Sequence, residues 1–229
     1  MRFVIGSASG ASGDPDALGV LVERFRREMR YPREEDCEYA AGRRDLLPIM
    51  SRAELETAIA APTLAHVAEF RRIASNTYGG PGNQIQINVH LKGGPSAASE
   101  LARSVRHLLY GPGGEVDRLD DVLEDSAWKV RGFGEALAVK CLAIVFPDRW
   151  LPFFLYPGKY GKGAIMRLPE LPIEPLFEEG KSRAQLAAES NDALRALLVP
   201  YFEDDVTGAT RFLWWRLHSA YGNPTATYR

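Results

Sequence analysis

The sequence has few cysteines and no long apolar run. Only Cys37 and Cys141 occur among its 229 residues, and two cysteines so far apart predict neither a disulfide framework nor a zinc cluster. No segment approaches the roughly 20 consecutive apolar residues that cross a bilayer, and the N-terminal MRFVIGSASG is too short in its apolar part for a secretory signal peptide. The sequence therefore predicts a globular, cytoplasmic protein with no membrane partner.

A basic excess is also missing from the chain as a whole. The formal net charge is -2, whereas nucleic-acid-binding domains are usually basic. The charges are unevenly distributed, however: residues 113–127 carry six acids against one base, and residues 128–167 carry seven bases against two acids. This change of sign at Trp128 favours a basic surface on the second of these segments.

Catalytic motifs are absent too. The stretch GKYGKGA is the nearest approach to a nucleotide-binding G-x-x-x-x-G-K-[ST] loop, but Ala164 stands where that loop needs lysine. No G-x-S-x-G elbow occurs, and the four histidines lie in separate segments without metal-ligand spacing. The sequence therefore predicts no catalytic residue, no cofactor and no metal ion within these 229 residues.

Helical patterns dominate the sequence. Apolar residues recur at helical spacing, and serine caps are predicted at Ser51, with Glu54, and at Ser182, with Gln185. The expected helices cover residues 14–31, 51–60, 63–75, 95–110, 116–128, 135–146, 182–198 and 207–221. The strict alternation of Ile85, Ile87 and Val89 is instead typical of a short strand. We expect a mainly α, multi-helix fold with at most a small β element around residues 84–90.

Glycine-rich and proline-rich joints suggest how the chain is organised. The GPGG stretch at residues 111–114 predicts a boundary between an N-terminal helical region, residues 1–111, and a second helical region, residues 112–229. The same stretch is equally typical of a surface loop within one continuous domain.

The most specific local pattern is VRGFGEALAVKCL, residues 130–142. It follows an acidic amphipathic helix and leads into an apolar one, so it predicts a tight turn between two helices, with Phe133 pointing inward. Gly132 and Gly134 would leave backbone N–H groups unshielded. Together with the positive end of a helix beginning near Glu135, these groups would form an anion site. The alternative is a turn that serves packing alone.

This stretch resembles the helix-hairpin-helix, whose signature positions are occupied by Val130, Gly132, Phe133, Gly134 and Ala138. The resemblance implies a fold element whose amides hold a DNA backbone phosphate without reading base sequence. It assigns that role to Gly132 and Gly134, with flanking charges from Lys129, Arg131 and Lys140. DNA glycosylases share the element, but their catalytic lysine and aspartate positions fall on Ala136 and near Phe154. Base excision is therefore not expected.

The similarity extends through Pro147, Asp148, Trp150 and Pro152 to a glycine-rich loop. This longer segment resembles the N-terminal DNA-recognition modules of McrB-type, modification-dependent restriction proteins and related prokaryotic defence proteins. The resemblance implies a partner DNA, including modified DNA. It also implies a nucleotide-hydrolysing motor, which would have to lie on a missing domain or on another chain.

The loop FFLYPGKYGKG adds aromatic and basic residues to the predicted interface. Tyr156, Lys159, Tyr160 and Lys162 combine stacking faces with phosphate-seeking charges. The alternative is a basic loop that covers the aromatic residues of the core. At the level of the whole protein, the alternative to a DNA-recognition module is a helical protein–protein interaction subunit of a defence complex, in which the hairpin is only structural.

Overall fold

Helices build the fold throughout the described part of the chain. The computed structural model describes residues 15–76, 78, 84–158, 161–174, 176–203 and 205–221, and these contain eleven α-helices, three short 3-10 helices and no strand. The mainly α fold class predicted from the sequence is confirmed.

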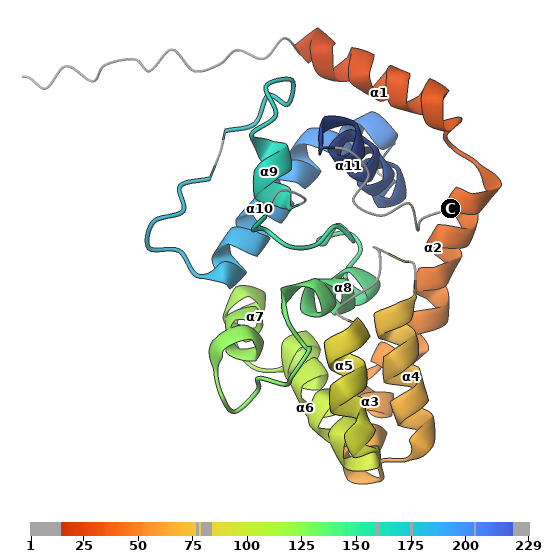
Figure 1. Cartoon of the computed structure of the whole chain (residues 1–229), viewed down its shortest axis with the longest axis vertical. Coiled ribbons are helices and arrows are strands. Elements are labelled where there is room, and N and C mark those ends of the chain that lie inside the picture. Colours follow the sequence, from red (N-terminus) through yellow and green to blue (C-terminus); the bar gives the residue numbers. More distant parts are fainter. Residues whose placement is uncertain are drawn as a thin grey trace, which may run out of the picture.

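The helices form two groups in space (Figure 1). The lower and middle part of the view holds α3 (Arg52–Ala60), α4 (Leu64–Ser75), α5 (Gln84–His90), α6 (Pro95–Tyr110), α7 (Glu115–Glu124) and α8 (Glu135–Val145). The upper part holds α1 (Pro15–Met29), α9 (Lys162–Met166), α10 (Arg183–Leu198) and α11 (Val206–Tyr221). Along one side, α2 (Glu34–Leu46) connects the two groups, and the 3-10 helices are η1 (Pro48–Met50), η2 (Leu91–Gly93) and η3 (Val199–Phe202).

The predicted caps mark the helix starts correctly. The Glu54 amide donates to Ser51 Oγ at 3.2 Å at the start of α3. At the start of α10, the Gln185 amide donates to Ser182 Oγ at 3.2 Å and the Ser182 amide donates to Gln185 Oε1 at 2.8 Å. Each bond satisfies an amide that has no partner inside the helix.

The predicted β element around residues 84–90 is wrong, because this segment is helix α5. The alternation of Ile85, Ile87 and Val89 would place all three on one face of a strand, but only Ile87 is fully buried and Ile85 is 76% exposed. Leu91, four residues after Ile87, is buried beside it. The pair buries one stripe of a helix, and this tertiary packing decides the conformation.

Two clusters of buried side chains form the core. The first joins α3, α4, α6 and α8, and the second joins α1, α10 and α11. The extended segment 150–156 lies between them: Trp150 and Phe154 pack into the first cluster, whereas Leu151, Phe153 and Tyr156 pack into the second. The first cluster draws on residues from both sides of Gly111, where the sequence predicts a boundary.

Candidate nucleic-acid interface

The turn that holds Gly132 and Gly134, called the hairpin below, lies on a longer connection than the tight turn predicted from the sequence. Helix α7 ends at Glu124 rather than near Trp128, and residues 125–134 lead to α8, which begins at Glu135 as expected. The Phe133 amide donates to the carbonyl of Val130 at 2.9 Å, and the Phe133 ring is 1% exposed. Phe133 therefore pins the turn to the core, as predicted.

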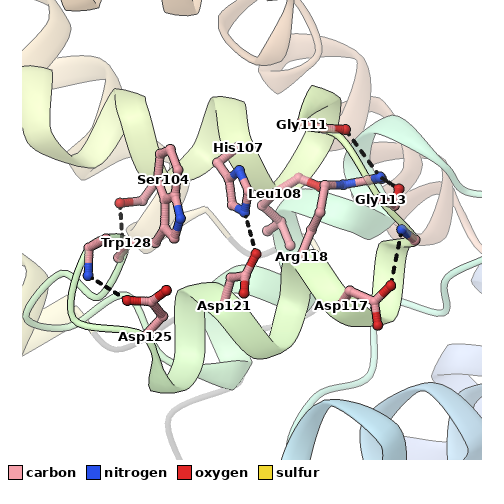
Figure 2. Close-up of polar contacts among 12 residues, drawn as sticks. Ser104, His107, Leu108, Gly111, Gly113, Asp117, Arg118, Asp121, Asp125 and Trp128 are labelled. Carbon is pink, nitrogen blue, oxygen red and sulfur yellow. Dashed lines mark hydrogen bonds and ion pairs between the residues drawn. The ribbon is translucent and has the colours of Figure 1, made fainter.

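Trp128 attaches the start of this connection to α6 (Figure 2). Its indole ring stacks on the imidazole of His107 with centroids 3.9 Å apart and planes 6° from parallel. Ser104 Oγ donates to the Trp128 carbonyl at 2.6 Å, and His107 Nε2 lies 2.8 Å from Asp121 Oδ2 of α7. The connection is thus fixed to two helices before it reaches the glycines.

Several acids of segment 113–127 hold local contacts. Asp125 Oδ1 accepts from the Ala127 amide at 2.8 Å, and Asp117 Oδ2 accepts from the Gly114 amide at 3.2 Å (Figure 2). Glu115 Oε2 accepts from Trp150 Nε1 at 3.0 Å. These carboxylates are therefore structural groups of the α6–α7 turn and its neighbours, in addition to giving α7 an acidic face.

The two glycines of the hairpin have different roles in the structure. Gly132 has a φ of +87°, and a Cβ there would lie 2.5 Å from the Ile87 amide nitrogen and 2.7 Å from the Gln86 carbonyl carbon. Gly134 has a φ of -97° and caps α8, and a Cβ there would meet no atom within 4 Å. Backbone conformation and close packing require glycine at 132, whereas neither requires it at 134.

Gly134 is the first of three residues at the start of α8 whose backbone amides lie outside the hydrogen-bond ladder of the helix. Within the described residues, no acceptor pairs with the amides of Gly134, Glu135 or Ala136 at the start of α8. Gly134 is exposed and Ala136 is partly exposed, whereas Glu135 is buried, so of the three residues only Gly134 is fully open to solvent at the positive end of the helix dipole. An exposed amide at the start of a helix is one element of the anion site that the glycine pattern predicts.

Two of the predicted basic contacts flank this site. Arg131 is exposed, and its Nε donates to Gln86 Oε1 at 3.0 Å, which leaves the Nη atoms of its guanidinium without a partner in the described part of the chain. Lys129 is also exposed, and its Nζ lies 3.5 Å from Glu124 Oε2. The contact between Arg131 and Gln86 joins the hairpin to α5, and no sequence motif indicated it.

The structure corrects the prediction that Lys140 contacts DNA, because this side chain lies inside the protein. Its side chain is 0% exposed, and its Nζ donates to the Asn76 carbonyl at 2.6 Å. Burial lowers the pKa of this ammonium to about 8. A DNA phosphate cannot reach it in the folded state, so Lys140 is not part of the candidate interface.

The predicted DNA contacts of Lys162 and Tyr156 are corrected in the same way. Lys162 is 0% exposed, donates to the Ala187 carbonyl at 3.1 Å and has its pKa lowered to about 8 by burial. Tyr156 is 6% exposed, and its hydroxyl donates to Glu178 Oε1 at 2.9 Å. Both residues belong to the packed interior. Lys159 and Tyr160, the other two predicted contacts of this loop, lie outside the described residues.

The first residue of α8 carries a buried carboxylate. Glu135, the first residue of α8, is 2% exposed, and its Oε1 accepts from the Tyr156 amide at 2.5 Å. Its Oε2 lies 3.5 Å from Arg183 Nη2. Burial raises the pKa of Glu135. The side chain therefore turns inward and binds the 150–156 segment to α8, away from the exposed Gly134.

One group of potential metal ligands occurs elsewhere in the described residues, at Glu54, His66 and Glu69, whose ligand atoms lie within 4.8 Å of one another. The Thr63 amide donates to His66 Nδ1 at 3.0 Å, and His66 Nε2 lies 3.3 Å from Glu54 Oε1. Nδ1 must therefore carry the lone pair and Nε2 the proton. Metal-binding histidines usually have the reverse arrangement, with the second nitrogen donating a proton, so these contacts favour a helix cap over a metal site.

Comparison with protein-family models, curated proteins and solved structures finds no match for this chain. Among the residues that the structure describes, none of the helices combines the length and the apolar content needed to cross a bilayer.

Proposed function

We propose that this protein binds the phosphate backbone of DNA through residues 129–136. The observation that carries the proposal is the position of Gly134, an exposed residue where the fold does not require glycine and whose amide has no acceptor among the described residues. A side chain at this position would crowd an approaching anion, and its absence favours close contact between backbone and phosphate.

The charges around this amide support an anionic ligand. Lys129 and Arg131 are exposed, residues 129–134 contain no acid, and the carboxylate of Glu135 is turned inward. Amides and guanidinium groups contact phosphate without reading base sequence. The hairpin would therefore supply affinity and orientation, while sequence or modified bases would have to be read by other residues.

The biological setting of the proposal rests on the resemblance to McrB-type recognition modules alone. On that basis, the chain would act in the cytoplasm as the DNA-recognition part of a prokaryotic restriction or defence system. A nucleotide-hydrolysing motor on another domain or chain would be its partner.

A protein–protein interaction subunit is the second candidate. It is favoured by the burial of Lys140, Tyr156 and Lys162, which removes three predicted DNA contacts, and by the net charge of -2. The packing of Gly132 against α5 also gives that glycine a purely structural reason. We prefer DNA binding because packing explains Gly132 and not Gly134.

The substitution Gly134→Asp separates binding from folding. Aspartate is a preferred helix cap and carries a negative charge at the positive end of α8, so it should stabilise the fold by about 0.5 kcal/mol. The same carboxylate would occupy the amides that a phosphate needs. Losing charge-assisted hydrogen bonds worth about 1.5–3 kcal/mol should weaken DNA binding by roughly 10- to 100-fold.

Fluorescence anisotropy with a labelled duplex, unmodified or methylated, measures the affinity, and urea denaturation measures the stability. Gly134→Ala is the comparison variant: it adds a side chain without a carboxylate, so it should weaken DNA binding by crowding the phosphate, but by less than Gly134→Asp does. Equal affinities for wild type and Gly134→Asp would reject the phosphate role. If the wild type binds no duplex, DNA binding is rejected and the protein–protein interaction subunit remains as the alternative.

A further inference from the structure

Helix α5 and the following η2 present an exposed stripe beside the hairpin. Ile85, Asn88 and Lys92 are exposed, while Ile87 and Leu91 are buried. Residues spaced by three and seven lie on one face of a helix. We propose that this stripe reads base edges in the major groove of DNA, with Ile85 and Asn88 as the specificity-determining residues; the inference rests on the proposed phosphate contact of the hairpin.

The hairpin contacts α5 at Gln86 and Ile87, which lie next to Ile85 and Asn88 in the sequence. Arg131 Nε donates to Gln86 Oε1 at 3.0 Å. The absence of a Cβ at Gly132 lets the hairpin backbone lie directly against the backbone of Gln86 and Ile87. A phosphate held at Gly134 would therefore fix the position of α5 relative to the same duplex.

The chemistry of the stripe suits base pairs. The carboxamides of Gln84 and Asn88 have no hydrogen-bond partner in the described part of the chain. An asparagine or glutamine amide can pair with N6 and N7 of adenine, and an apolar side chain can contact the methyl group of thymine. Ile85 is an apolar side chain that stays 76% exposed in the fold.

Charge complementarity favours DNA as the occupant of this surface. Residues 84–94, from the start of α5 past η2, contain no acid; Lys92 lies within the stripe, and Arg131 contacts Gln86 beside it. An α-helix with its side chains is about 10–12 Å across, and the major groove is about 12 Å wide. A short helix at the surface of the protein can therefore enter that groove while the hairpin contacts the adjoining backbone.

Selection of bound duplexes from a randomised pool tests the inference. The wild type should enrich sequences with A·T pairs at fixed positions. Asn88→Ala and Ile85→Ala should each lose the preference at one position and weaken binding to the selected duplex by roughly 5- to 150-fold. Both variants should bind an unselected duplex within about twofold of the wild type, because phosphate contacts act on all sequences alike.

Leu64→Ala is the matched control, since Leu64 is 73% exposed on the neighbouring helix α4 but lies outside the stripe; it should keep the wild-type preference. Arg131→Ala should weaken all duplexes equally. Binding without any base preference, or a preference that survives in the double variant Ile85→Ala/Asn88→Ala, would overturn the role of α5 while leaving the phosphate contact intact. A wild type that binds no duplex would overturn both.

Discussion

Alanine substitutions at the two hairpin glycines should differ in their effect on stability: Gly132→Ala should destabilise the fold, whereas Gly134→Ala should not. At Gly132, a φ of +87° disfavours any residue with a Cβ, by roughly 1–2 kcal/mol. The new Cβ would also lie 2.5 Å from the Ile87 amide nitrogen, and overpacking of this kind costs roughly 1–3 kcal/mol. We expect Gly132→Ala to lower the free energy of unfolding by roughly 2–5 kcal/mol.

Gly134→Ala should leave stability nearly unchanged. Its φ of -97° suits alanine, and its Cβ would meet no atom within 4 Å. Alanine is a poorer cap than glycine by roughly 0.5–1 kcal/mol, but the loss of backbone freedom in the unfolded chain offsets about 0.4–1 kcal/mol.

Urea denaturation followed by circular dichroism compares the two variants with the wild type. A Gly132→Ala variant as stable as the wild type would refute the close packing of the hairpin on α5. A Gly134→Ala variant destabilised by more than about 2 kcal/mol would show that the fold needs glycine there too, which would remove the main support for the phosphate role.

Two further predictions concern the buried and capped polar groups. The pKa of Lys162 falls from 10.5 to about 8 on folding, so the unfolded chain binds more protons than the folded chain between pH 8 and 10.5. The free energy of unfolding of the wild type should therefore rise with pH across this window. Relative to Lys162→Met, the rise should reach about 3 kcal/mol. Urea titrations at pH 7, 8.5 and 10 measure this difference, and a constant difference would contradict the buried position of the ammonium. His66 caps α4 through Nδ1, so added zinc should change the melting temperatures of the wild type and of Glu69→Gln equally. A zinc-dependent rise in the wild type alone would instead support a metal site.

The features predicted well from the sequence depend on neighbours along the chain. The Ser51 and Ser182 caps act within one helical turn, and the inward position of Phe133 follows from an apolar residue between two glycines. Such short-range signals are visible in the sequence because the interacting groups lie within four residues of each other.

The features that sequence reasoning missed depend on tertiary packing. Helix α2 is rich in charged residues, so it lacks the apolar stripe that indicates a helix. Lys140 and Lys162 have the charge of surface residues, but distant carbonyls, of Asn76 and Ala187, satisfy their ammonium groups inside the protein. For Lys140 a signal was present: its neighbours in EALAVKCLAIV are nearly all apolar, which is typical of a buried helix.

Nuclear magnetic resonance of the backbone amides during titration with a short duplex tests the central claim most directly. The account predicts that the amide signals of Gly134, Glu135 and Ala136 shift first and furthest, and that these shifts disappear in Gly134→Asp. Large shifts elsewhere with these three amides unchanged, or no shifts with any duplex, would contradict the proposal that the start of α8 holds a DNA phosphate.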